Sequence, residues 1–127
     1  MKNEFVTYEQ AVAVRELGLN IDNYLGVYGL DGRHLYNVHG NKFDVVDEMF
    51  FIKAPLKQQV FRWFREKHEC YANLSSWIHE EELGIYHEFE IYKVKQYSHG
   101  SIRFKTYEEA ENACIDKLIE IAKQQEK

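Results

Sequence analysis

The spacing of apolar residues predicts three amphipathic helices separated by two strand-rich segments. The clearest helix is expected to begin at Pro55, because the first helical position has no use for the N–H that proline lacks. Its apolar residues recur at i, i+4, i+7 and i+8 and form a single stripe: Leu56, Val60, Trp63 and Phe64. Phe61 lies about 100° away from that stripe, so it needs a second contact surface.

The first and last helices are expected to start at two copies of one heptapeptide. FVTYEQA at Phe5–Ala11 returns as FKTYEEA at Phe104–Ala110, with five of seven positions identical. In each copy the Thr is a suitable N-cap, and Gln10 or Glu109 three positions later can complete a capping box. The repeat therefore predicts that the two ends of the fold are built alike. Gly18 is expected to end the first helix, and the last helix has its own stripe: Tyr107, Ala110, Cys114, Leu118 and Ile121.

An Asp-Gly pair predicts the first hairpin. Asp31-Gly32 joins the strand-like runs Tyr24–Leu30 and Arg33–Val38, and such a pair favours a two-residue turn because both of its residues adopt positive φ readily. This turn sets the opposing pairs: Tyr28 with Leu35, and Gly26 with Asn37. Gly26 would also permit the close approach of a ring to the strand.

A second hairpin is predicted from two runs rich in aromatic and β-branched residues, Tyr71–His79 and Ile85–Lys95. Two registers are open, and a one-residue slip between them moves every side chain to the other face. One register places His79 opposite His87. The other places Ile78 opposite Phe89, and we favour it because it gathers apolar side chains on one face: Leu74, Ile78, Phe89 and Ile91.

The elements follow the order α-β-β-α-β-β-α. We expect a two-layer α+β fold in which an antiparallel sheet of two hairpins packs against three helices. Residues 1–127 are expected to form a single domain, since the length suits one domain and no Pro-, Gly- or Ser-rich linker interrupts the chain. The run Met49–Ile52 fits either a strand or a buried loop, because periodicity does not decide over four residues.

Three parts of the sequence resemble one group of small proteins: the FxTYEEA starts, Ala54–Lys67 and Glu108–Lys123. The group is encoded in phage and prophage-like regions, many of them in Bacteroides-type bacteria. In relatives the middle helix often opens with Thr-Tyr-Gln-Gln-Ala, which here reads Leu56–Val60, a third and degraded copy of the heptapeptide. The resemblance carries no activity and no functional residue. It implies a phage- or prophage-type accessory protein that acts in the cytoplasm on a host or phage protein.

Charge and composition narrow the functional classes. The net charge of −5 disfavours general affinity for nucleic acid, because phosphate-backbone binders are basic. No apolar run approaches the ~20 residues that span a bilayer, and no charged-then-apolar signal segment is present at the N-terminus. Two cysteines make no disulfide framework, so a reducing, cytoplasmic location is expected.

Candidate chemistry is sparse. The histidines and carboxylates of the second hairpin include no H-E-x-x-H or C-x-x-C pattern that would arrange them for zinc. Cys70 is expected at a helix C-terminus, where the dipole disfavours a thiolate, and Cys114 is expected to be buried. The acidic segment with Asp44 and Asp47 is typical of a solvated loop. We therefore expect no enzymatic activity, no catalytic residue, no metal site and no cofactor.

The preferred hypothesis is a non-enzymatic module that binds a protein, with a homodimer as the first partner to consider. It rests on nine Tyr, eight Phe and two Trp and on the lack of a catalytic constellation. A first alternative is a small-molecule or nucleotide pocket between sheet and helices, and a second is a nucleic-acid-binding regulator that uses the middle helix. The candidate interaction or pocket residues are Tyr24, Tyr28, Phe61, Trp63, Trp77, His87 and Tyr92.

Overall fold

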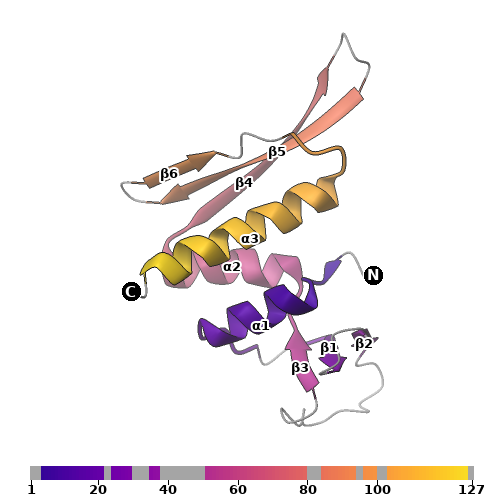
Figure 1. Ribbon diagram of the computed structural model, residues 1–127, viewed down its shortest axis with the longest axis vertical. Helices are drawn as coiled ribbons and strands as arrows, with labels where there is room; N and C mark the ends of the chain where they lie inside the picture. Colours follow the sequence, from indigo (N-terminus) through magenta and orange to yellow (C-terminus); the bar gives the residue numbers. More distant parts are fainter. Residues whose placement is uncertain are drawn as a thin grey trace. The chain divides into compact units, whose positions relative to one another are not determined.

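The chain is α+β, and its helices and hairpins follow the predicted order (Figure 1). The computed structural model describes residues 4–21, 24–29, 35–37, 51–79, 84–93, 96–99 and 103–125. The chain divides into two compact units, residues 1–60 and 61–127. The described strands form two separate three-stranded sheets, so the expected single sheet of two hairpins is not what forms. Each hairpin instead gains a third strand of its own.

The described residues of the first unit include one complete helix and one antiparallel sheet with the strand order β2-β1-β3. Its elements are α1 (Tyr8–Glu16), β1 (Gly26–Gly29), β2 (Leu35–Asn37) and β3 (Phe51–Ala54). The predicted hairpin register is confirmed, with Tyr28 opposite Leu35 and Gly26 opposite Asn37. Residues 31–32, where the turn was predicted, lie outside the described residues. The run that pattern alone left open contributes to a strand, since β3 pairs Ile52 with Tyr28.

Both ends of α1 are closed as the sequence predicts. The Gln10 N–H donates to the Thr7 hydroxyl (3.2 Å), and the Thr7 N–H donates to the Gln10 side chain (3.0 Å), which completes a capping box. Gly18 follows the helix with a φ of 109°. The Leu19 N–H then reaches the Val14 carbonyl (2.9 Å) and the Gly18 N–H reaches that of Arg15 (3.0 Å), the bond pair of a Schellman motif.

The first copy of the heptapeptide also attaches α1 to the sheet. Phe5 forms an isolated antiparallel bridge with Leu56 and presses its ring against Gly26, where an added Cβ would lie 2.9 Å from Phe5 Cε1. Three residues later, the Tyr8 ring meets Tyr28 edge-on at 5.8 Å. Phe5 and Tyr8 thus contact two positions of β1 that share one face.

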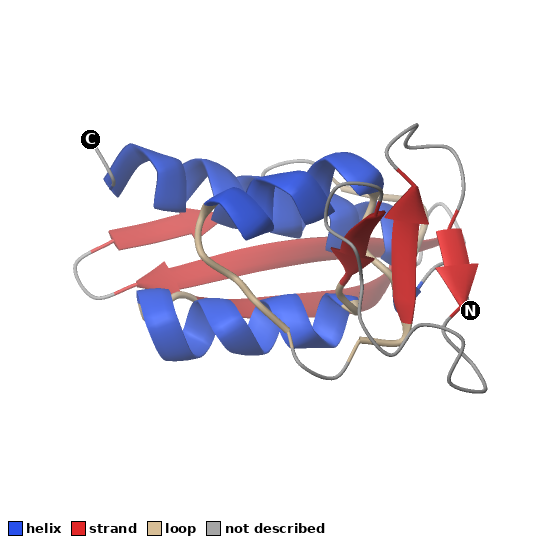
Figure 2. Cartoon of the chain, turned by 90° about the horizontal axis from the view of Figure 1, so that it is seen from below, coloured by secondary structure: helices blue, strands red, loops and turns tan. Residues whose placement is uncertain are grey.

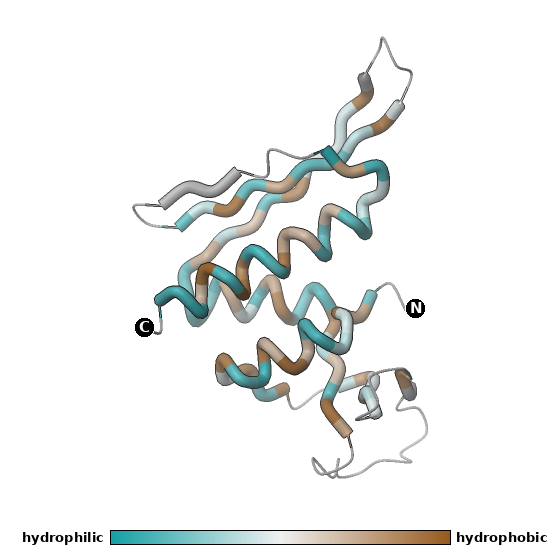
Figure 3. Tube along the Cα trace, in the orientation of Figure 1, coloured by the Kyte–Doolittle hydropathy of each residue, from teal (hydrophilic) through white to brown (hydrophobic). Residues whose placement is uncertain are grey.

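The second unit contains a meander of strand order β4-β5-β6 with helix α3 packed on β4 and β5 (Figures 1 and 2). Its elements are β4 (Tyr71–His79), β5 (Gly84–Lys93), β6 (Gln96–His99) and α3 (Tyr107–Gln125). Four of the five predicted stripe positions of α3 are buried: Ala110, Cys114, Leu118 and Ile121. The fifth, Tyr107, is partly exposed at the start of the helix. Figure 3 shows apolar positions recurring between polar ones along this helix.

The register of the second hairpin differs from both predicted registers. Leu74 lies opposite Phe89, Ile78 opposite Ile85, and His79 opposite Gly84. Relative to the favoured register, the partner of Phe89 has moved from residue 78 to residue 74. That displacement is an even number of residues, so the predicted grouping of Leu74, Ile78, Phe89 and Ile91 on one face is retained. The alternation of apolar residues predicted correctly which side chains share a face of the hairpin, but it predicted the opposing residue pairs wrongly. Alternation fixes only which side of a strand is apolar.

The second copy of the heptapeptide repeats the arrangement of the first. Phe104 bridges His87 through two backbone hydrogen bonds of 2.9 Å and stacks on Phe89, with ring centroids 6.2 Å apart. Tyr107 then meets the His87 ring edge-on at 5.8 Å. The Glu109 N–H donates to the Thr106 hydroxyl at 3.1 Å, which confirms the predicted cap. The two ends are therefore alike in the bridging phenylalanine, the threonine cap and the edge-on tyrosine.

Helix α2 (Lys57–His68) crosses from the first unit into the second. It begins two residues later than predicted, because Pro55 precedes the cap and uses its carbonyl to accept from the Val6 N–H (3.1 Å). The Leu56 N–H donates to the Gln59 side chain at 2.8 Å, as the Thr7 N–H does to Gln10. The degraded third copy of the heptapeptide thus retains half of a capping box at the start of α2.

Candidate functional site

One face of the sheet in the second unit presents a row of aromatic and polar side chains that we call the open face. Alternation along the two longest strands places eight residues on it: Tyr71, Asn73, Ser75 and Trp77 of β4, with Tyr86, Glu88, Glu90 and Tyr92 of β5. None of the eight is buried, whereas Phe89 and Ile91, which alternate with them, are buried on the opposite face. Because α3 packs on β4 and β5 and an antiparallel sheet needs cover on only one face, the other remains accessible.

The open face has the same pattern on both strands: aromatic, polar, polar, aromatic. Tyr71 lies opposite Tyr92 at one end, and Trp77 lies opposite Tyr86 at the other. Six residues of extended chain separate the two pairs, which is roughly 20 Å. The polar centre includes two carboxylates on β5, Glu88 and Glu90, one beside each aromatic pair.

A guanidinium occupies the Trp77–Tyr86 end. The Arg103 side chain lies over the Trp77 ring at 4.6 Å and the Tyr86 ring at 5.9 Å. Its Nε is 3.7 Å from a Glu88 carboxylate oxygen. The planar, weakly hydrated guanidinium suits this combination of ring face and carboxylate better than an ammonium does. Arg103 directly precedes the bridging Phe104, so the second heptapeptide copy places it there.

The Tyr71–Tyr92 end is more exposed, at 52% for Tyr71 and 44% for Tyr92. The Tyr92 hydroxyl donates to a Glu90 carboxylate oxygen. Among the side chains that the structure describes, Glu90 has no cationic partner within ion-pair distance, unlike Glu88. This end therefore combines two exposed rings with a carboxylate.

The seven residues predicted from sequence do not assemble into one site. Two of them, Trp77 and Tyr92, lie on the open face. His87 lies on the opposite face, where its Nδ1 is 2.6 Å from the Ser76 hydroxyl. Phe61 is buried, so the second contact surface that its position requires is protein interior.

Each of the other three predicted residues contacts other groups of the protein. Tyr28 is buried and donates to the Val6 carbonyl at 2.6 Å, and burial, aided by the nearby Glu9, raises the pKa of its hydroxyl. Trp63 packs edge-on against Phe64 and His68, at 5.0 and 4.8 Å. Tyr24 lies 5.0 Å from the Lys53 ammonium.

Six of the eight residues of the open face were not among the predicted site residues, and neither was the arginine that packs on it: Tyr71, Asn73, Ser75, Tyr86, Glu88, Glu90 and Arg103. The signal was present in the run Tyr86–Tyr92, which reads Y-H-E-F-E-I-Y: tyrosines and glutamates alternate with a histidine and two apolar residues. Strict alternation over seven residues is the pattern of a half-buried strand. Arg103 had no such signal, because its position over Trp77 depends on the path of the chain.

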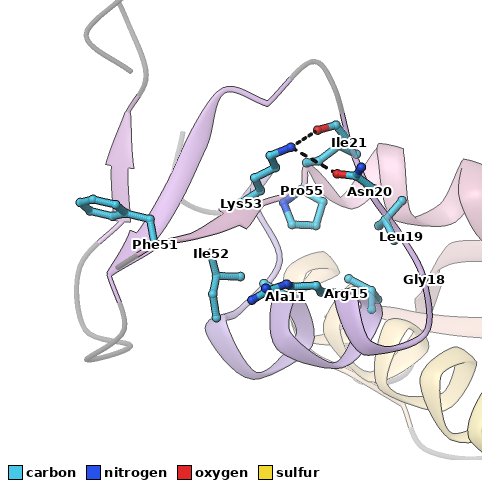
Figure 4. Close-up of a pocket in the computed structure, with 11 residues that line it drawn as sticks. Ala11, Arg15, Gly18, Leu19, Asn20, Ile21, Phe51, Ile52, Lys53 and Pro55 are labelled. Atoms are coloured by element: carbon cyan, nitrogen blue, oxygen red, sulfur yellow. Dashed lines mark hydrogen bonds between the residues drawn. The ribbon is translucent and has the colours of Figure 1, made fainter. Parts of the chain in front are cut away.

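A separate cavity of about 180 Å³ lies within the first unit, between α1 and β3 (Figure 4). Apolar side chains dominate its wall, among them Ala11, Val14 and Ile52, and Arg15 and Lys53 add positive charge. The Lys53 ammonium donates to the Asn20 side-chain oxygen (3.2 Å) and to the Ile21 carbonyl (3.0 Å). None of the seven predicted residues lines this cavity.

The surroundings of the two cysteines disfavour their thiolate forms. Burial raises the pKa of the Cys70 thiol, and burial next to Glu111 raises the pKa of the Cys114 thiol to about 12, so neither is a ready thiolate at neutral pH.

On the basic side of α2, Arg62 pairs with Glu66 at 2.9 Å, which lowers the pKa of the Glu66 carboxyl through the hydrogen bond and the positive charge. Glu66 therefore interrupts the positive charge along the helix.

Within the described residues, no group of three or more histidine, cysteine or carboxylate side chains is arranged to hold a metal ion. No described helix combines the length and apolar character needed to cross a membrane. Comparisons of the chain with protein-family models, curated proteins and solved structures found no match.

Proposed function

We propose that this protein is a non-enzymatic interaction module that binds another protein through the open face of its second sheet. The observation that carries the proposal is the row of four aromatic side chains, two exposed and two half-buried, on a face that α3 leaves uncovered. Tyr, Trp and Arg are the residues in which binding energy concentrates at protein interfaces, and all three occur here. Rigid rings on a sheet also lose little conformational entropy on binding.

The dimensions of the face favour a transient complex. Two strands over four alternate positions cover roughly 20 Å by 10 Å, which is about 200 Å² in projection. Stable complexes bury about 800 Å² on each partner. The open face alone therefore fits a weak or regulated interaction, and a tighter complex would need additional surface.

Site-specific crosslinking tests the proposal. A photoreactive residue replacing Ser75, at the centre of the open face, should capture a partner that is not captured from Lys123 on the exposed side of α3. Replacing both Tyr71 and Tyr92 by Ser should reduce capture from Ser75 without changing the melting temperature by more than a few degrees. Equal capture from both positions, or none from either, would contradict the proposal.

The resemblance to phage and prophage proteins supports the setting that we propose, a cytoplasmic accessory protein acting on a host or phage partner. Self-association is a separate part of the proposal and points to a different surface. Ile78 and Ile85 lie opposite one another at the end of the hairpin and are 69% and 57% exposed. If the chain forms a homodimer, Ile85→Lys should convert it to a monomer in light scattering coupled to gel filtration. A dimer that survives this substitution would exclude the isoleucine pair as the interface.

The cavity of the first unit favours a second candidate function, the binding of a small carboxylate with an apolar body. A cavity of about 150 Å³ can hold a benzene-sized ring, and Arg15 and Lys53 would attract the carboxylate. Titration with benzoate should shift the backbone amides of Leu19 and Ile52 in an NMR spectrum. Lys53→Met should weaken this response, whereas Lys117→Met on α3 should not. A response that is insensitive to Lys53→Met would contradict this assignment.

A further inference from the structure

We propose that the Tyr71–Tyr92 end of the open face binds an arginine side chain from a basic segment of the partner protein. This inference rests on the proposed function and adds the chemistry of the partner to it. The arginine would stack on the exposed tyrosine rings and pair with the Glu90 carboxylate. Its basis is the other end of the same face, where the protein's own Arg103 is bound in this way.

Arg103 shows what the local geometry recognises. Two cross-strand aromatic residues, Trp77 and Tyr86, offer electron-rich ring faces, and Glu88 lies two residues from Tyr86 on the same side of β5. The guanidinium lies over both rings and near the carboxylate at once. This contact forms on a solvent-exposed surface, so the combination attracts a guanidinium without deep burial.

The Tyr71–Tyr92 end repeats these components in mirror order. Along the open side of β5 the sequence is Tyr86, Glu88, Glu90, Tyr92, so each tyrosine has a carboxylate two residues toward the centre. Tyr71 supplies the cross-strand ring that Trp77 supplies at the other end. The Tyr92 hydroxyl bonded to Glu90 is a neutral donor and leaves the negative charge in place.

Charge favours a basic partner over the other macromolecules that could cover this face. A second copy stacked antiparallel would place Glu88 and Glu90 against the same carboxylates, and like charges at close range are unfavourable. Nucleic acid would bring phosphates to the same centre in a chain whose net charge is −5. A basic segment gains from both the local carboxylates and the overall charge.

A peptide titration followed by NMR tests this inference on the full chain. The probe is a Gly/Ser peptide carrying two arginines, and its control is the same peptide with citrulline, which keeps the planar side chain and removes the charge. We expect the arginine peptide to bind with a dissociation constant of about 0.1–1 mM and to shift the backbone amides of Tyr71, Glu90 and Tyr92. The citrulline peptide should bind at least about tenfold more weakly, and added salt should weaken only the arginine peptide.

Two variants locate the contact. Glu90→Gln keeps the size of the side chain and should reduce affinity about tenfold, whereas the matched control Glu120→Gln on α3 should leave it unchanged. Tyr71→Leu provides an independent second variant, because it removes a ring face at an exposed position without altering charge. The amide spectrum of each variant should show the native dispersion, which confirms folding before the titration is read.

The inference is overturned if the citrulline peptide binds as well as the arginine peptide, if neither binds at about 1 mM, or if Glu90→Gln has no effect. It is also overturned if the shifts map to the Trp77–Tyr86 end. Failure of this inference and failure of the proposed function remain distinguishable. Specific crosslinking from Ser75 without arginine binding would retain the protein-binding function and exclude a basic partner, whereas loss of both results would remove the function as well.

Discussion

Gly26→Ala tests how closely the Phe5 ring packs against β1 in the first unit. The added Cβ would lie 2.9 Å from Phe5 Cε1, 3.1 Å from Phe5 Cζ and 3.2 Å from Leu35 Cδ1. Phe5 cannot retreat easily, because its ring is buried and its backbone is bridged to Leu56. Overpacking of this kind costs about 1–3 kcal/mol, and the lower entropy of the unfolded chain offsets about 0.4–1 kcal/mol. We therefore expect a net loss of up to roughly 2.6 kcal/mol in the free energy of unfolding.

A double-mutant cycle makes this prediction specific. In a Phe5→Leu background the obstructing ring is gone, so Gly26→Ala should be neutral or stabilising, and the two changes should couple by about 1 kcal/mol or more. Urea denaturation followed by circular dichroism measures all four free energies. Gly18→Ala is the matched control, because a Cβ at Gly18 would meet nothing within 4 Å while its φ of 109° makes alanine strained. The stability lost through Gly18→Ala should therefore be the same in the native chain and in the Phe5→Leu background. Uncoupled effects of Gly26→Ala and Phe5→Leu would refute the proposed contact.

Three further predictions concern the helix ends and the buried thiol. Thr7→Ala and Thr106→Ala should each cost about 1 kcal/mol in urea denaturation, and Ser at either site should recover most of it; equal effects of Ala and Ser would argue against capping. Glu69 follows α2 with a φ of 55°, so Glu69→Gly should stabilise by roughly 0.5 kcal/mol, and destabilisation would contradict the strain. The folded-state pKa of Cys114 is raised from 9.0 to about 12, so its stabilising contribution is complete below pH 9 and is lost as pH rises toward 12. Unfolding measured between pH 8 and 11 should therefore show less pH-dependent loss for Cys114→Ala than for the native chain, and identical slopes would refute this.

The repeated heptapeptide is a device that both caps a helix and docks it. In each copy Phe5 or Phe104 bridges a neighbouring segment, the Thr caps the helix, and Tyr8 or Tyr107 meets a strand ring edge-on. The two edge-on contacts are both 5.8 Å long. One short sequence therefore solves the same packing problem twice, although the strand orders of the two sheets differ.

Features that depend on near neighbours in the chain were predictable from the sequence. The caps at Thr7 and Thr106 and the left-handed end at Gly18 each involve residues within one or two turns. The pairing of Tyr28 with Leu35 was predicted from the Asp31-Gly32 pair in the sequence. The alternation in β5 likewise separated its buried side from its open side, because a strand reverses its side chains at every residue.

Features that depend on distant segments required the tertiary structure. Three features join segments whose sequences give no indication that they meet. They are the pairing of β3 with β1, the division of the strands into two sheets and the position of Arg103 over Trp77. The register of the second hairpin was also beyond the pattern, since alternation is satisfied by any displacement of an even number of residues. The sequence by itself determined where the first and last helices start and which sides of the strands are apolar. Only the path of the folded chain decided which strands pair and which aromatic rings remain at the surface, because those outcomes depend on contacts between residues far apart in the chain.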